Sequence, residues 1–122
     1  MIRVVLIEDN EVFRQALKML LGLNHEIEVV GTRPDGAEAV EICRELRPDV
    51  MLVDYRLPGL DGVQVTRLVH RKCPEVSIVA LTAAAGEREV EAMLDAGAVA
   101  CVRKDEPLDA IVDAIRAAAP VR

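Results

Sequence analysis

The sequence predicts an α/β fold in which five parallel strands alternate with five helices. Short apolar runs alternate with segments whose apolar residues recur every three or four positions, as on one face of a helix. The expected helices span 10 to 14 residues each, a length that connects parallel strands through right-handed crossovers. The inner runs are apolar throughout, which is typical of strands covered by helices on both faces. A length of 122 residues predicts one domain, 1–122, with no output domain.

The first part of the chain predicts a strand, a helix and a second strand. An apolar run at 2–7 ends in acidic residues and is expected to be a buried strand. A helix is expected from 12 to 21, where apolar residues recur at helical spacing. Apolar and polar residues then alternate over 26–31, which predicts a strand that ends at Gly31.

Pairs of polar residues predict where the second and third helices begin. Asp35 precedes Glu38 by three residues, which is the spacing of a capping box, and predicts a helix over 35–46. Asp61 and Gln64 repeat the pattern. The next elements are strand 49–54, helix 61–71 and strand 76–83.

The last part of the chain has two helix signals. Gly97 is expected to end a helix over 87–97. Pro107 is expected in the first turn of the final helix. The last elements are strand 98–104 and helix 105–118.

Composition excludes several classes of function. The net charge of -6 and a pI near 4.9, with no basic stripe, argue against direct nucleic-acid binding by this domain. No apolar run approaches the roughly 18 residues of a membrane span, and no signal peptide is expected. The three cysteines, Cys43, Cys73 and Cys101, fit neither a zinc site nor a disulfide framework. Reduced thiols in a cytoplasmic protein are therefore expected.

Chemically useful residues stand where the predicted strands end. Glu8 and Asp9 follow the first strand, Asp54 ends the third, Thr82 lies in the fourth and Lys104 ends the fifth. Each alone is more often a helix cap or a surface residue. In an open parallel sheet, however, these strand ends meet at one edge, where ligands bind. Their joint placement predicts one site.

The chemistry of this predicted site is that of phosphoryl transfer. Glu8, Asp9 and Asp54 would repel one another unless a cation joined them, and carboxylate oxygens with waters suit Mg²⁺. The Thr82 hydroxyl and the Lys104 ammonium could each bind one phosphoryl oxygen. A carboxylate nucleophile with these neighbours is equipped to accept a phosphoryl group.

The chain resembles the receiver domain of bacterial two-component response regulators over essentially its whole length. The matching segments are VVLIEDNEVFR, DGAEAVEICRELRPDVMLVDYRLPGLDG, IVALTA and GAVACVRKDEP. The segment GAEAVEICRELRPDV looks most like receivers that precede a LuxR-type helix-turn-helix domain. The resemblance implies a flavodoxin-like or CheY-like doubly wound (βα)5 fold, whose five-stranded parallel sheet has the strand order 2-1-3-4-5.

The resemblance also implies roles for individual residues. Asp54 would be the phosphoacceptor, and Asp9 and Asp54 would coordinate Mg²⁺. Glu8 would act mainly through metal-bound water, and the backbone carbonyl of Arg56 would complete the protein ligands. The switch residues would be Thr82 and Lys104. The loop after the acceptor would be shaped by Pro58 and Gly59, and Gly62 would let the third helix start close beside it.

The resemblance further implies the partners. The phosphoryl donor would be a sensor histidine kinase or a histidine phosphotransfer protein, and the output would be control of transcription. The domain would be a self-phosphorylating and self-dephosphorylating switch rather than a turnover enzyme. A homodimer through the fourth helix, fifth strand and fifth helix is one way it could associate. The chain would be either a stand-alone receiver or part of a longer regulator.

Two residues depart from the family pattern. Cys101 stands where the family usually has Tyr or Phe, and its small thiol is expected to pack in the core. Asp105 stands where proline often follows the lysine, so a cis peptide bond is not expected there. Cys101 motivates an alternative, a pseudo-receiver that binds partners without phosphorylation. An aspartate-based phosphatase would need a second acid where Arg56 stands.

Three further residues bear on the predicted site. Arg56 and Ala84 follow Asp54 and Thr82 by two residues and are expected to flank the phosphoryl group. Arg56 either influences hydrolysis of phospho-Asp54 or simply faces solvent. Tyr55 is expected to pack away from the metal. The two histidines are expected at the surface.

Overall fold

The computed structural model describes residues 1–83 and 86–120, and these form the predicted α/β architecture. Within them, five parallel strands make one sheet in the order β2-β1-β3-β4-β5, which confirms the expected strand order. The strands are β1 (Ile2–Ile7), β2 (Ile27–Arg33), β3 (Val50–Asp54), β4 (Ser77–Thr82) and β5 (Ala100–Arg103). The helices are α1 (Glu11–Gly22), α2 (Ala39–Leu46), α3 (Gly62–Lys72), α4 (Glu87–Ala96) and α5 (Leu108–Ala118).

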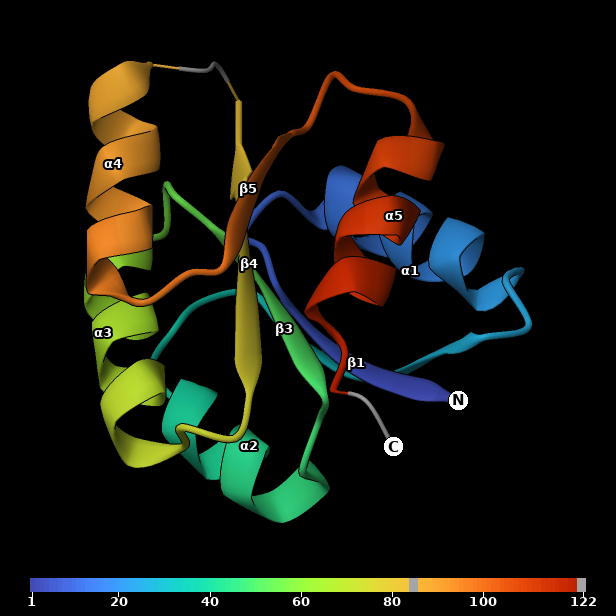
Figure 1. Cartoon of the computed structure of the whole chain (residues 1–122), viewed down its shortest axis with the longest axis horizontal. Helices are drawn as coiled ribbons and strands as arrows, with labels where there is room; N and C mark the ends of the chain where they lie inside the picture. Colours follow the sequence, from blue (N-terminus) through green and yellow to red (C-terminus); the bar gives the residue numbers. More distant parts are fainter. Residues whose placement is uncertain (84–85, 121–122) are drawn as a thin grey trace.

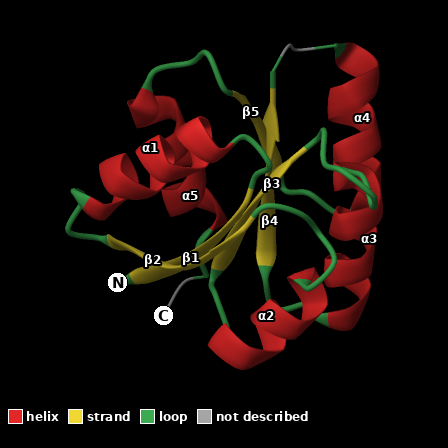
Figure 2. Ribbon diagram, turned by 180° about the vertical axis from the view of Figure 1, so that it is seen from behind, coloured by secondary structure: helices red, strands yellow, loops and turns green. Residues whose placement is uncertain are grey.

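The helices cover both faces of the sheet. Helices α1 and α5 lie on one face, and α2, α3 and α4 lie on the other (Figures 1 and 2). Successive strand residues point to opposite faces, so each face has its own apolar core. Toward α2, α3 and α4 the strands contribute Val5, Ile7, Met51, Val53, Ile78 and Ala80. Toward α1 and α5 they contribute Val4, Leu6, Val50, Leu52, Val79 and Leu81.

The second strand is longer than predicted, because Gly31 does not end it. Strand β2 continues to Arg33, which pairs with Ile7 beyond a register shift between Val4 and Val5. A Cβ atom at Gly31 would lie 2.8 Å from Leu46 Cδ1. The glycine therefore lets α2 pack closely on β2, and it is a packing residue rather than a strand end.

The capping prediction is wrong for α2 and correct for α3. Asp35 Oδ1 accepts a hydrogen bond from Ala37 N at 2.9 Å, so its carboxylate closes a turn, and α2 begins only at Ala39. In α3, Asp61 Oδ1 accepts from Gln64 N at 2.9 Å, and Gln64 Oε1 accepts from Asp61 N at 3.0 Å. The reciprocal pair satisfies two amides at the helix start.

The remaining helix signals give one confirmation and one correction. Gly97 ends α4 as predicted, with a φ of 122° that favours glycine. Pro107 is the residue just before α5 and does not lie in its first turn. The preceding residues form a turn instead, in which Glu106 N donates to Arg103 O at 3.2 Å. The described backbone has no cis peptide bond, in agreement with the expectation for Asp105.

The cysteines are free thiols, as expected. Cys43 and Cys73 are buried, and Cys101 is half-buried. Burial, helped by the neighbouring Cys73, raises the pKa of the Cys43 thiol to about 12. A protonated buried thiol acts as a small apolar side chain. Within 1–83 and 86–120, no helix combines the length and the apolarity that crossing a membrane requires.

Candidate functional site

The five predicted site residues lie at the carboxyl ends of the strands. Glu8 and Asp9 directly follow β1, Asp54 ends β3, Thr82 ends β4 and Lys104 directly follows β5. Because all five strands are parallel, these positions share one edge of the sheet.

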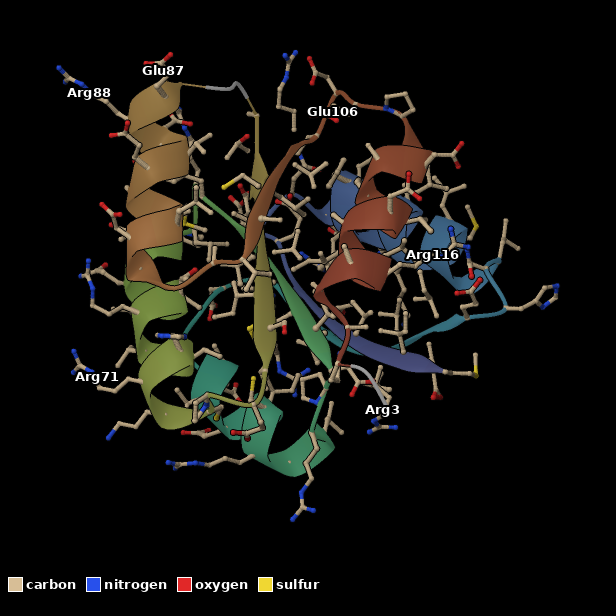
Figure 3. All side chains as sticks on the ribbon, viewed as in Figure 1. Arg3, Arg71, Glu87, Arg88, Glu106 and Arg116 are labelled. Carbon is tan, nitrogen blue, oxygen red and sulfur yellow. The ribbon has the colours of Figure 1, made fainter. Side chains whose placement is uncertain are left out.

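Labelled side chains mark this edge in Figure 3. Glu87, at the start of α4, and Glu106, between β5 and α5, lie at the end of the molecule that carries the site. Arg3 of β1 and Arg71 of α3 lie at the end of the molecule opposite the site.

Three carboxylates meet at this edge. Glu8, Asp9 and Asp54 each offer one carboxylate oxygen, and these oxygens all lie within 4.8 Å of one another. Glu8 and Asp54 are buried, whereas Asp9 is exposed. Oxygen donors with one side open to water are the ligand set that Mg²⁺ prefers. The residues present fit a magnesium ion.

The Lys104 ammonium lies against two of these acids. Its Nζ is 3.0 Å from Asp54 Oδ2 and makes a closer ion pair with Glu8 Oε1. Burial alone would lower the pKa of Lys104, but the bonds to Glu8 and Asp54 outweigh burial and raise it. Lys104 is therefore a fixed positive charge beside Asp54.

Glu8 is the most perturbed acid of the site. Burial, reinforced by the Asp54 charge, raises the pKa of Glu8 to about 7. Hydrogen bonds from Lys104 and from Asn10 N, the latter at 2.9 Å, oppose this shift without cancelling it. Near neutral pH and without a metal, the Glu8 carboxyl is therefore expected to be partly protonated.

This shift predicts how stability depends on pH. Because the folded pKa of Glu8 lies above its ordinary 4.5, the folded state binds the Glu8 proton more tightly than the unfolded state. In EDTA, this contribution is full below pH 4.5 and is lost as pH rises through about 7. The loss is about 3 kcal/mol of unfolding free energy. Urea titrations across this range should show it in the parent and not in Glu8→Gln.

The matched control for this pH effect is Glu11→Gln, which makes the same chemical change at an exposed position of α1. It should keep the parental pH dependence. Indistinguishable curves for the parent and Glu8→Gln would contradict the assignment.

Thr82 has a buried hydroxyl group that forms no hydrogen bond with any described residue. The residue is 1% exposed, and its Oγ1 has no hydrogen-bond partner among these residues. A buried hydroxyl without a partner costs about 1–3 kcal/mol. Asp54 pairs with Leu81 in the sheet, so Thr82 stands one residue beyond the partner of Asp54. An oxygen-rich ligand on Asp54 would give this hydroxyl a partner.

The loop after β3 holds Asp54 in a fixed orientation. Arg56 N donates to Asp54 Oδ1 at 3.1 Å, and Gly62 N donates to Tyr55 O at 3.0 Å. Gly59 turns the loop with a φ of 73°. A Cβ at Gly62 would lie 2.2 Å from the Asp54 carbonyl oxygen, so α3 starts against the end of β3, as the resemblance implied.

The residues that flank the site take different positions. The Arg56 side chain is 79% exposed, and its Nη2 lies 3.9 Å from Glu89 Oε1 on α4. Tyr55 packs against the apolar cluster toward α2, α3 and α4, as predicted. Cys101 packs against the same cluster, with its Sγ 3.9 Å from Val90 O. Ala84 lies outside the described residues.

Sequence reasoning missed one residue that touches the site. The Lys104 Nζ lies 4.9 Å from the centroid of the Phe13 ring. Phe13 reads in the sequence only as one apolar position of a helix. The available signal was the scarcity of aromatics, because the chain has one Phe and it stands four residues after Asp9.

The comparisons with known proteins agree with this geometry. The chain matches the response regulator receiver domain over residues 4–116. The transcriptional regulatory protein LiaR of Bacillus subtilis is 39% identical over 118 residues, which are 97% of this chain and 56% of LiaR. This chain spans about half the length of curated relatives such as LiaR and DegU.

Solved receiver domains share the fold. The signal receiver domain of NarL from Mycobacterium tuberculosis has a TM-score of 0.85 at 33% identity, covering 94% of this chain and 96% of that one. The response regulator domain of Thermotoga maritima CheB has a TM-score of 0.90 at 28% identity, covering 100% and 98%. Since the family match spans most of the chain, and relatives agree with it in sequence and in fold, this protein belongs to the response regulator receiver domains.

Proposed function

We propose that this receiver domain takes a phosphoryl group onto Asp54 in a Mg²⁺-dependent reaction. The observation that carries the proposal is the convergence at Asp54 of Glu8, Asp9 and Lys104 at one rim of the sheet. In the reaction, an Asp54 carboxylate oxygen forms a bond to phosphorus while the bond from phosphorus to the donor breaks.

Different residues of the site would bind the metal ion and the phosphoryl oxygens. Asp9, Asp54 and the backbone carbonyl of Arg56 would hold Mg²⁺, and Glu8 would act through a water. When bound, the ion would neutralise charge on the phosphoryl oxygens. Lys104 would hold one of those oxygens by its charge, and the Thr82 hydroxyl would donate to another.

The partners and the output are also part of the proposal. The donor would be a histidine kinase or a histidine phosphotransfer protein, and the domain would act in the cytoplasm as a switch without turnover. LiaR and DegU are transcriptional regulatory proteins, which supports an output in transcription. Exposed Leu94 on α4 and Val99 before β5 make a homodimer through α4, β5 and α5 a reasonable mode of association.

Treatment with acetyl phosphate and Mg²⁺ tests the proposal, with a phosphate-affinity gel as the readout. A shifted band that disappears with EDTA and with hydroxylamine, which cleaves acyl phosphates, is expected. The small Cys101 favours the second candidate, a phosphorylation-independent pseudo-receiver. Absence of any shifted band in the parent would support the pseudo-receiver and contradict the proposal that Asp54 is phosphorylated.

Arg56→Ala should shorten the half-life of phospho-Asp54 several-fold. The Arg56 side chain extends toward Glu89 on α4, with Nη2 3.9 Å from Glu89 Oε1, and from there it can shield the phosphoryl group from water. Decay of radiolabelled protein after removal of the donor measures the half-life.

Arg88→Ala is the matched control. Arg88 is an exposed arginine at the same end of the molecule, and its side chain projects outward from α4 (Figure 3). Its half-life should equal that of the parent. An unchanged half-life in Arg56→Ala would end the idea.

A further inference from the structure

A single ammonium group connects the acidic site to an aromatic ring. Lys104 Nζ lies 3.0 Å from Asp54 Oδ2 and also pairs with Glu8. The same Nζ lies 4.9 Å from the centroid of the Phe13 ring, within the range of a cation–π contact. Lys104 therefore lies between two carboxylates and one ring.

The position of Phe13 is fixed by the loop that carries the acids. Asn10 Oδ1 accepts from Phe13 N at 2.9 Å and caps α1, which places Phe13 in the first turn. Asn10 N in turn donates to Glu8 Oε2 at 2.9 Å. The ring is thus tied through Asn10 to Glu8, one of the two acids that Lys104 contacts.

A groove lies behind the ring, between α1 and α5. Its volume is about 130 Å³, and Phe13 and Lys104 both form part of its wall. The other lining residues include Ala16, Leu20, Leu108 and Ile111. Because both partners of the cation–π contact line the groove, a displacement of the ammonium changes the groove as well as the acid site.

The aromatic residue that the family usually has at position 101, on the other face of the sheet, is replaced here by Cys101. Cys101 packs toward α2, α3 and α4, where its thiol lies 3.9 Å from Val90 O. A thiol is too small to respond as a ring would. Among the described residues, Phe13 is the aromatic side chain in contact with the lysine.

We propose that Phe13 is a positioning residue for Lys104, and that it transmits occupancy of the Asp54 pocket to the groove between α1 and α5. The inference rests on the proposed function, since Lys104, which already contacts Asp54 and Glu8, must transfer part of this contact to a phosphoryl oxygen on Asp54. Before phosphorylation, the Phe13 ring orients the Lys104 ammonium toward the acids. When the ammonium moves, the cation–π contact between Phe13 and Lys104 changes or is lost.

The single phenylalanine of the chain allows a direct test. Growth with 4-fluorophenylalanine gives a protein of parental sequence with one aromatic fluorine resonance. Beryllofluoride with Mg²⁺ serves as the phosphoryl mimic, and its own bound fluorine signals appear in the same spectrum. We expect the Phe13 resonance to move when bound beryllofluoride appears.

The outcomes separate this inference from the proposed function. Bound beryllofluoride with an unmoved Phe13 resonance overturns the inference and leaves the proposed function standing. Absence of bound beryllofluoride in the parent, with its presence in a known receiver run alongside, counts against both. This test needs no substitution, so it does not depend on a variant that folds.

A double-mutant cycle tests the positioning role. Phe13→Leu keeps an apolar side chain without a ring face, and should lower the rate of phosphorylation by acetyl phosphate about 2- to 30-fold, the range that loss of a cation–π contact gives. Phe13→Tyr keeps the ring and should restore the rate. In a Lys104→Met background, Phe13→Leu should have little further effect. Equal rate losses in both backgrounds would mean that Phe13 acts only through packing.

Discussion

Asp54→Asn should take up no phosphoryl group from acetyl phosphate, under conditions that label the parent fully. The amide that replaces the carboxylate is a poor nucleophile and cannot carry the negative charge that binds the metal. The variant should keep its fold, because it removes one of three clustered carboxylates and so lowers their repulsion. Phosphate-affinity gels measure the uptake.

The same variant predicts a change in metal binding. Mg²⁺ should raise the Tm of the parent, because a ligand that binds only the folded state stabilises it, and should raise the Tm of Asp54→Asn much less. Asp61→Asn is the control, since Asp61 lies in the same loop but caps α3, and asparagine also caps helices well. It should behave as the parent does. Undiminished labelling of Asp54→Asn would disprove the assignment of the acceptor.

Gly62→Ala should cost about 3 kcal/mol of unfolding free energy or more, because the new methyl group has no room. Its Cβ would lie 2.2 Å from the Asp54 carbonyl oxygen and 2.7 Å from Tyr55 Cα. Both atoms belong to the backbone, so relief requires α3 to move away from the end of β3. Urea denaturation measures the stability, and the phosphorylation rate should fall with it because the Asp54 loop moves.

Gly22→Ala is the control for the glycine substitution. It makes the same change at the last residue of α1, where no atom from outside the local helix backbone lies within 4 Å of the added Cβ. Alanine should be tolerated there and should stabilise the helix by about 0.5–1 kcal/mol. Equal denaturation midpoints for the two variants would contradict the close contact at Gly62.

The fold was predictable because alternating strand and helix patterns leave few topologies. Apolar runs such as β1 and β3 read as buried strands, and the helices between them require parallel pairing. The helix starts were less predictable. The same pattern of an acid followed three residues later by Glu or Gln gave a capping box at Asp61 and a turn at Asp35. A local hydrogen bond from Ala37 N to the Asp35 carboxylate decided the second case.

The candidate site was predictable in its members and not in its contacts. Residues at the ends of parallel strands share one rim, so Glu8, Asp54 and Lys104 could be grouped from the sequence. That Lys104 pairs more closely with Glu8 than with Asp54 required coordinates. The contact with Phe13 also required them, since a helical residue and a strand-end residue far apart in the chain carry no shared pattern.

By itself the sequence determined the family, the order of the elements and the group of acids with a lysine and a threonine, because periodicity and strand ends are local properties of the chain. Only the tertiary structure decided which groups are buried. Burial raises the pKa of Glu8 and leaves the Thr82 hydroxyl without a hydrogen-bond partner among the described residues. The tertiary structure also places Phe13 against Lys104. Burial and close contact arise from residues distant in sequence. Their effects on charge and hydrogen bonding exist only once the chain has packed.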